Sequence, residues 1–176
     1  MGQVIAALDV GGTSIKTGAV RFGVGDDPRI EIGPVLPANS NETADRVFDS
    51  LAAGADAALG LAGPEVSGLA IAICGPFDIE AGISRMRGVH KFEEIYGIDV
   101  NAAVRERLPW ASALPIRFAR DAESAGTGEA LAGAGAGFDR VLTVTVGTGL
   151  GTCLTAHARP VEFVDGFGVE HLGMRD

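Results

Sequence analysis

The chain has 176 residues, of which 47% are hydrophobic and 21% are charged, a composition that supports a substantial core. Its formal net charge is −9 and its basic residues form no cluster, so nucleic acid is not an expected partner. The N-terminal residues lack a basic lead, and the longest apolar runs are far too short to cross a bilayer. We therefore expect no signal peptide and no membrane segment. Cys74 and Cys153 lie in predicted strands, which indicates buried thiols in a reducing cytoplasm.

The predicted elements mix strands and helices along the whole chain. Alternating and β-branched stretches predict strands over residues 3–10, 14–22, 29–36, 67–74, 116–119, 140–147 and 150–156. Helical spacing of apolar residues predicts helices over residues 43–61, 102–108 and 122–132. Asp99 or Asn101 could cap the second helix, and residues 75–97 are expected to be mostly loop. This order predicts an α/β fold.

The most informative segment is the turn between the first two predicted strands. An apolar run reaches Asp9, then Gly11, Gly12 and Thr13 interrupt it, and a second strand carries Lys16. Glycines let the backbone turn sharply and present bare N–H groups, which suit a phosphate chain together with the Thr hydroxyl and the Lys ammonium. Asp9 is placed to hold Mg²⁺. The alternative is a β-hairpin with a polar tip.

A second segment repeats this pattern near the other end of the chain. The β-branched strand over residues 140–147 leads into Gly147, Thr148 and Gly149, and Gly151 lies in the next strand. Neither copy precedes a helix, so this is not a Rossmann arrangement, and no Gly-Lys-Ser/Thr ends the turn as in a P-loop. Two such hairpins suggest two related halves that grip one polyphosphate chain.

These two hairpins resemble the first and second phosphate motifs of the actin/hexokinase/heat-shock ATPase superfamily. In detail the chain resembles the ROK family of sugar kinases and repressors, on four further segments: residues 70–78, 88–92, 118–125 and 168–173. The resemblance implies a ribonuclease-H-like (actin-like ATPase) domain with a mixed sheet over residues 1–118. The first part of a second such domain, apparently truncated, would follow over residues 119–176.

The resemblance also implies a reaction, the ATP-dependent phosphorylation of a sugar hydroxyl with Mg²⁺. Asp121 occupies the position of the family's catalytic Asp, so it is the expected general base; Asp at this place also suits a helix N-cap. The turn at Gly75 and Pro76 resembles the one that lies near the sugar. Glu170 and His171 resemble the second sugar-binding segment, although an ordinary exposed histidine is an alternative for His171.

Two positions depart from the family pattern. Arg120 stands where members usually carry an Asn that binds a sugar hydroxyl; it could contact a phosphate or acidic group of the substrate, or pair with Glu123. Gly173 stands where a zinc-binding His is usual, and the two cysteines lack zinc-site spacing, so no zinc is expected. These departures leave the identity of the sugar open.

Three functions remain compatible with the sequence. The first is an ATP-dependent, glucokinase-like carbohydrate kinase; the others are a non-catalytic sugar-binding or regulatory protein and a polyphosphate-dependent relative. Because the first phosphate motif begins within ten residues of Met1, we do not expect a DNA-binding helix-turn-helix before it. The chain ends at Asp176 without the adenosine motif, so we expect a fragment of a longer cytoplasmic enzyme. The expected partners are a sugar, a nucleotide and a second copy of the protein, with no nucleic acid and no membrane.

Overall fold

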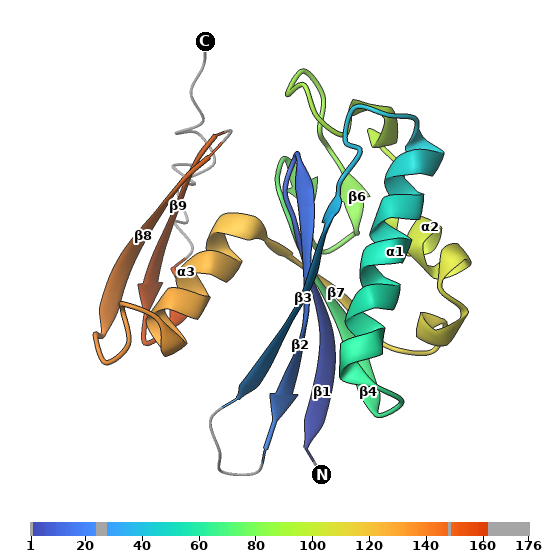
Figure 1. Ribbon diagram of the computed structural model, residues 1–176. Helices are drawn as coiled ribbons and strands as arrows, with labels where there is room; N and C mark the ends of the chain where they lie inside the picture. The colour runs from blue at the N-terminus through green and yellow to red at the C-terminus, as the bar shows by residue number, and fades with distance from the viewer. Residues whose placement is uncertain (1, 24–27, 148, 162–176) are drawn as a thin grey trace. The chain divides into compact units, whose positions relative to one another are not determined.

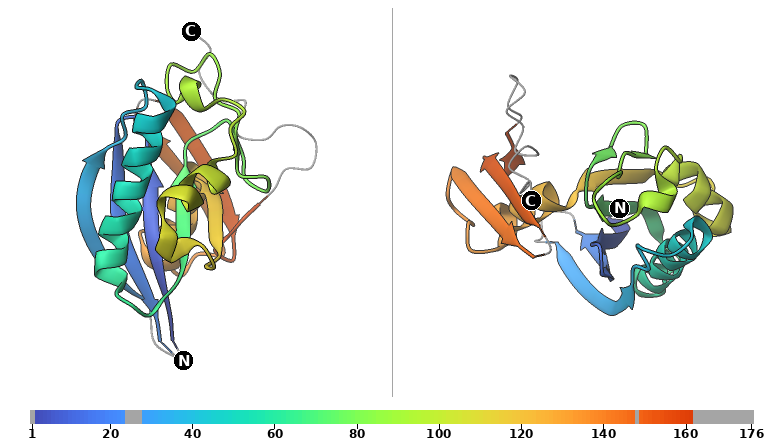
Figure 2. Two further views of the ribbon diagram at one scale, coloured as in Figure 1. Left: turned by 90° about the vertical axis from the view of Figure 1, so that its right-hand side faces the viewer. Right: turned by 90° about the horizontal axis from the view of Figure 1, so that it is seen from above.

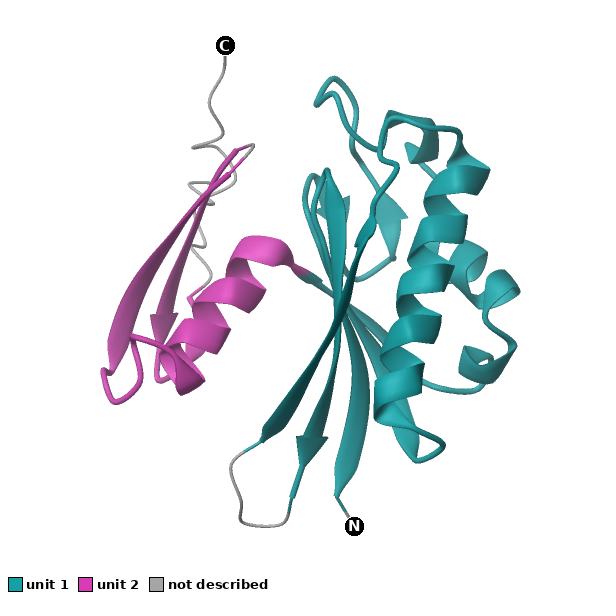
Figure 3. Cartoon of the chain, viewed as in Figure 1, with its two compact units in different colours: residues 1–119 teal, residues 120–176 magenta. Residues whose placement is uncertain are grey.

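The chain forms two compact units, residues 1–119 and residues 120–176 (Figure 3). The computed structural model describes residues 2–23, 28–147 and 149–161. Each unit has its own sheet and its own helix packing, and each is described by itself below.

The first unit is built on a mixed sheet with the strand order β3-β2-β1-β4-β7 (Figure 1). Its strands are β1 (Gln3–Val10), β2 (Ser14–Phe22), β3 (Arg29–Pro37), β4 (Val66–Ile73) and β7 (Ile116–Arg120). β1 pairs antiparallel with β2, and β2 antiparallel with β3, whereas β1 and β4 run parallel. This confirms the predicted α/β fold with the sheet order of an actin-like ATPase N-terminal domain.

Helix α1 (Ala44–Ala62) covers one face of this sheet (Figure 2). The strand residues beneath it alternate with the pleat, so the buried residues of β1 are Val4, Ala6, Leu8 and Val10. The helix is slim where it meets the sheet: a Cβ on Gly54 would lie 3.1 Å from Cγ2 of Ile15. The Ala- and Gly-rich composition of α1 therefore permits a close approach of helix and sheet.

Short elements fill the connection between β4 and β7, where the sequence predicted mostly loop. They are β5 (Phe77–Asp78), β6 (Ile83–Ser84), the 3₁₀ turn η1 (Glu93–Ile95), α2 (Val100–Arg107) and the 3₁₀ turn η2 (Pro109–Ala111). Asp99 is the N-cap of α2, because its Oδ1 accepts the Ala102 N–H at 2.9 Å. The helix thus begins at Val100, two residues before the predicted start.

The second unit contains α3 (Asp121–Ala132) packed on an antiparallel sheet. The strands are β8 (Arg140–Val146), β9 (Leu150–Ala156) and β10 (Arg159–Pro160), in the order β10-β9-β8. α3 meets the sheet through glycine: a Cβ on Gly126 would lie 2.6 Å from both Cβ and Sγ of Cys153. Only a residue without a side chain allows this approach, so Gly126 sets the distance between α3 and β9.

The two cysteines are both buried, as the sequence predicted. Cys153 lies in β9, but Cys74 comes directly after β4 and not within it, and its Sγ lies 4.0 Å from Sδ of Met86. No helix in the described part of the chain combines the length and the apolar character that crossing a membrane requires.

Candidate functional site

The turn between β1 and β2 is a tight hairpin, as predicted. Asp9 pairs with Lys16 and Val10 with Ile15 across the two strands. The Gly11 N–H donates to the Ser14 carbonyl at 3.0 Å and closes the turn. Gly12 and Thr13 therefore lie at the tip.

The carbonyl groups of this tip accept hydrogen bonds from the loop before α1. The Gly12 carbonyl accepts from the Ser40 hydroxyl, and the Thr13 carbonyl accepts the Ala38 N–H at 3.0 Å. A trans peptide points its N–H opposite to its C=O, so the Thr13 N–H points away from Ser40. Within the described residues, the Gly12 and Thr13 amides have no acceptor. Two unpaired amides at a glycine turn form an arrangement that binds anions.

Ser40 is a residue that the sequence did not single out. It is 6% exposed and lies in the loop before α1, where a Ser between polar residues is unremarkable. Its role in bracing Gly12 depends on a contact between two segments 28 residues apart. No local pattern carries that information.

Asp9 and Lys16 face each other beside the tip. Lys16 Nζ donates to Asp9 Oδ2 at 2.7 Å, and both side chains are substantially exposed. Such a pair contributes less than about 1 kcal/mol, so the two groups can rearrange when an anion binds. Asp9 Oδ1 has no hydrogen-bond partner among the described residues.

The Asp9 carboxylate fits a magnesium ion that is also coordinated by phosphate oxygens. No group of three or more potential protein ligands gathers anywhere in the described residues. Mg²⁺ at phosphate sites commonly takes one or two carboxylates and completes its shell with water and phosphate oxygens. Asp9 can supply that one carboxylate.

The Gly75–Pro76 turn lies at the same edge of the sheet as Asp9. β1 and β4 are parallel and adjacent, with Asp9 opposite Ala72. The Cys74 N–H, directly before the turn, donates to the Val10 carbonyl at 3.2 Å. The carboxyl ends of both strands thus meet here, which is where ligands bind to open α/β sheets.

In the second unit, Asp121 is the first residue of α3. Its Oδ1 accepts the Ala122 N–H at 2.8 Å, and Arg120 holds the N-cap position without a side-chain capping bond. Asp121 thus binds an amide at the helix start. The alternative prediction, that Asp121 is the helix N-cap, is wrong, because Arg120 occupies that position. Asp121 Oδ2 has no hydrogen-bond partner in the described part of the chain. Its catalytic role stays a prediction.

Arg120 forms an ion pair in the first turn of α3. Its Nη1 lies 2.8 Å from Glu123 Oε1, and both side chains are more than one-third exposed. This is the second of the two alternatives that the sequence left open for Arg120. The substrate contact stays a prediction.

The second hairpin joins β8 to β9, and the Gly147 N–H donates to the Gly149 carbonyl at 3.0 Å. A Cβ on Gly147 or Gly149 would meet no described atom within 4 Å, so the turn is open to solvent there. Gly151, in β9, lies under the start of α3, because a Cβ on it would be 3.0 Å from the Ala122 Cβ. Gly151 therefore lets the helix that carries Asp121 pack against this hairpin.

Four residues of the predicted site lie outside the described residues. They are Thr148 of the second turn, Glu170, His171 and Gly173. Their predicted roles remain predictions.

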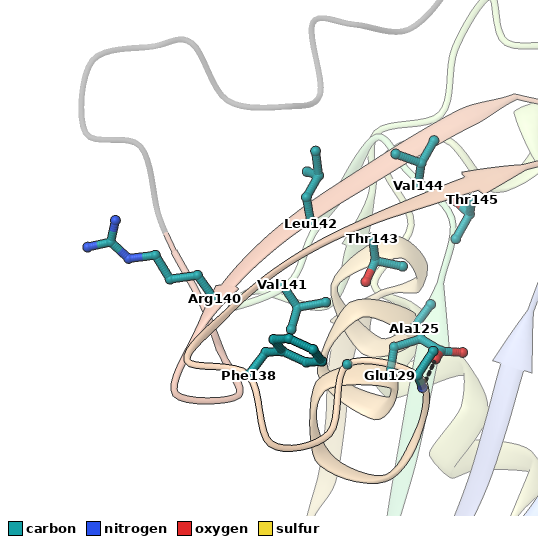
Figure 4. A pocket seen from close by; sticks show the side chains of 11 residues that line it. Ala125, Glu129, Phe138, Arg140, Val141, Leu142, Thr143, Val144 and Thr145 are labelled. Carbon is teal, nitrogen blue, oxygen red and sulfur yellow. Dashed lines mark hydrogen bonds between the residues drawn. The ribbon is translucent and has the colours of Figure 1, made fainter.

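A hollow of about 570 Å³ lies between α3 and β8 in the second unit (Figure 4). Glu129 and Phe138 line it together with the β8 side chains from Arg140 to Thr145. None of the predicted site residues lines this hollow. The hollow therefore gives no support to the predicted chemistry, whatever its size.

Several known proteins of similar sequence and structure carry the names of sugar kinases. The chain is 28% identical over 148 residues to a beta-glucoside kinase of Listeria monocytogenes, covering 84% of this chain and 45% of that protein. The crystal structure of a ROK hexokinase from Thermus thermophilus matches with a TM-score of 0.70 and 27% identity, covering 97% of this chain and 52% of that one. An inorganic polyphosphate/ATP-glucomannokinase from an Arthrobacter species matches with a TM-score of 0.62 and 26% identity, covering 93% and 62%.

The chain spans about half the length of the curated relatives that it matches. The model of the ROK family matches residues 5–173, which is nearly the whole chain and includes both hairpins, the Gly75–Pro76 turn and Asp121. The chain therefore belongs to the ROK family.

Proposed function

We propose that the protein containing this chain transfers the terminal phosphoryl group of ATP to a hydroxyl group of a sugar. One observation carries the proposal: the Gly12 and Thr13 amides lack an acceptor among the described residues, at a braced turn beside the Asp9 carboxylate. Membership of the ROK family, and relatives named as sugar kinases, support this reading of the turn.

Phosphoryl transfer asks the protein mainly to position two groups and to neutralise charge. The Gly12 and Thr13 amides would donate to phosphate oxygens, and the turn at Gly147 and Gly149 is a second candidate phosphate turn. Asp9 would hold Mg²⁺, which supplies positive charge at the phosphates.

Asp121 would act as the general base. The sugar oxygen forms a bond to the terminal phosphorus, the bond from that phosphorus to the ADP oxygen breaks, and the hydroxyl proton passes to the carboxylate. The Ala122 N–H fixes Oδ1 of Asp121, which leaves Oδ2 to accept this proton.

The sugar site would include the Gly75–Pro76 turn, Arg120, Glu170 and His171. The relatives are named for beta-glucosides, hexoses, and glucose and mannose, which supports a hexose or a hexoside as the substrate class. We propose a cytoplasmic protein, since ATP is the proposed donor.

Inorganic polyphosphate is a second candidate donor. The Arthrobacter relative, at 26% identity over 93% of this chain, is named for both polyphosphate and ATP. The net charge of −9 disfavours a long anion, because a polyphosphate chain needs a cationic groove beyond the terminal phosphates.

The test is a donor-by-sugar panel on the complete gene product that contains this chain. Each of several hexoses and beta-glucosides is incubated with Mg²⁺ and either ATP or polyphosphate, and phosphorylated sugar is measured by mass spectrometry. We expect product with ATP and at least one sugar. If product forms with polyphosphate and not with ATP, polyphosphate replaces ATP as the proposed donor. Sugar binding without product from either donor would refute the kinase proposal.

A further inference from the structure

The chain contains only two lysines, Lys16 and Lys91, and both lie at the first phosphate turn. Lys16 is part of β2, opposite Asp9. Lys91 belongs to a distant loop, yet a Cβ placed on Gly12 would lie 3.1 Å from Lys91 Cδ and 3.8 Å from its Cβ. The aliphatic stem of Lys91 therefore crosses directly over Gly12.

The loop that carries Lys91 is bound to the same residue that braces the turn. The Phe92 N–H donates to the Ser40 carbonyl at 2.7 Å, and the Ser40 hydroxyl donates to the Gly12 carbonyl. The Phe92 side chain is 1% exposed and anchors the loop in the core. Ser40 thus connects the Lys91 loop and the turn through two hydrogen bonds.

The backbone on both sides of Lys91 adopts an uncommon conformation. His90 has φ 57° and Phe92 has φ 54°, in the left-handed region that costs a residue with a side chain about 1 kcal/mol or more. The Glu93 carboxylate accepts the His90 N–H at 2.9 Å, and this bond lowers the pKa of Glu93. Strain of this kind persists only where the surrounding contacts hold it, and it is common at ligand sites.

The two lysines differ in their electrostatic environment. Lys16 Nζ is held by Asp9 at 2.7 Å, whereas Lys91 forms no ion pair or side-chain hydrogen bond among the described residues. The stem of Lys91, whose ammonium has no carboxylate partner among the described residues, thus passes over the turn that presents the Gly12 and Thr13 amides. These donors all suit an anion.

We propose that the Lys91 ammonium binds the terminal phosphate group of the phosphoryl donor at the first phosphate turn. This inference rests on the proposed function, because it assigns a further binding residue to the same site. Lys91 would act as a point charge that neutralises the group being transferred, while Gly12 and Thr13 orient it through their amides. The shared ligand chemistry is a phosphate dianion, whether from ATP or from inorganic polyphosphate.

The chain offers a direct test, because lysine labelled with ¹³C at the ε-carbon gives only two side-chain signals. Lys91→Arg assigns them, and the labelled 176-residue chain is titrated with inorganic tripolyphosphate. A second titration uses a hexose 6-phosphate, which is a sugar phosphate of the class that the proposed reaction forms. We expect the Lys91 signal to shift with tripolyphosphate at lower concentration than with the sugar phosphate.

Three variants separate the local contact from the general charge effect. Lys91→Met keeps the stem and removes the ammonium, so tripolyphosphate should bind about fivefold to tenfold more weakly. Lys91→Arg should retain most of the affinity. Arg87→Met removes the same charge from the same loop, but Arg87 lies over the Tyr96 ring at 5.1 Å, so its affinity should match the unaltered chain.

The outcomes distinguish this inference from the proposed function. A shift of the Lys16 signal alone, with unchanged affinity in Lys91→Met, would overturn the role of Lys91 and leave the phosphate turn intact. If neither signal shifts, the phosphate turn itself is refuted. A Lys91 response to the sugar phosphate alone would place Lys91 at the product and overturn its assignment to the donor.

Discussion

The packing of α3 on β9 through Gly126 predicts opposite results for two identical substitutions in one helix. In Gly126→Ala, the new methyl group would lie 2.6 Å from both Cβ and Sγ of Cys153. In Gly128→Ala, the methyl group would meet no described atom within 4 Å. Both changes carry the same intrinsic gain, since Ala in a helix is about 1 kcal/mol better than Gly.

The contact geometry gives the magnitude. Carbon atoms pack best at about 3.5–4.0 Å, so the methyl group of Gly126→Ala would be about 1 Å too close to two atoms. Overpacking of this kind costs up to about 3 kcal/mol, which leaves a net loss of about 2 kcal/mol after the helix gain. Gly128→Ala should instead stabilise the second unit by about 1 kcal/mol.

The assay uses two residues that report on different units. Thiol labelling of Cys153, in a Cys74→Ala background, measures opening of the second unit, because Cys153 is 3% exposed. The fluorescence of Trp110, the chain's one tryptophan, follows the first unit in the same sample. Gly126→Ala should raise the labelling rate about thirtyfold, and the urea midpoint of Trp110 should not change. Equal labelling rates in Gly126→Ala and Gly128→Ala would refute the packing account.

Three further predictions address other parts of the structure. Asp99→Ala removes the cap that binds the Ala102 N–H, so the first unit should lose about 1 kcal/mol in urea unfolding, whereas Asp99→Asn should lose little. Burial, and secondarily the Glu123 carboxylate, raise the pKa of Cys153 above 9.0, so the folded chain holds a proton that the unfolded chain releases. This thiol should therefore leave the stability of the second unit unchanged below pH 9.0, the ordinary pKa of the thiol, and lower it as the pH rises further. Cys153→Ala should remove this loss of stability at high pH. Gly149→Val should fold normally but bind nucleotide more weakly by calorimetry; unchanged affinity would contradict the second phosphate turn.

The sequence predicted those parts of the fold that depend on local pattern. The hairpin at Gly11 and Gly12 follows from β alternation interrupted by glycine, and α1 follows from apolar spacing over five turns. The β5 and β6 strands have two residues each, which is too short for any period to show. They exist because they pair with each other, and pairing is a tertiary contact.

The candidate site shows the same division. Asp9, Gly12 and Asp121 were predicted because motifs and family resemblance mark them, and their roles stay predictions. The bracing of the turn by Ser40 was missed, because it depends on a contact between segments far apart in the chain. Lys91 was considered only as a loop residue that could reach the substrate or stay solvated, and its stem lies at Gly12 through another long-range contact. For Arg120, sequence reasoning left two partners open, since either was chemically reasonable, and the geometry shows the Glu123 ion pair.

The central claim is that this chain carries the phosphate turn and the general base of a sugar kinase. The most direct measurement is transfer of labelled phosphate from ATP to the sugar by the complete gene product, with Asp121→Asn compared against the unaltered protein. Asp139→Asn is the matched control, because the Asp139 carboxylate is 89% exposed in the same unit and contacts only His157 among the described residues, at 3.7 Å. The account predicts that Asp121→Asn lowers kcat by about a hundredfold or more while Asp139→Asn leaves it unchanged. Near-normal kcat in a folded Asp121→Asn variant would contradict it.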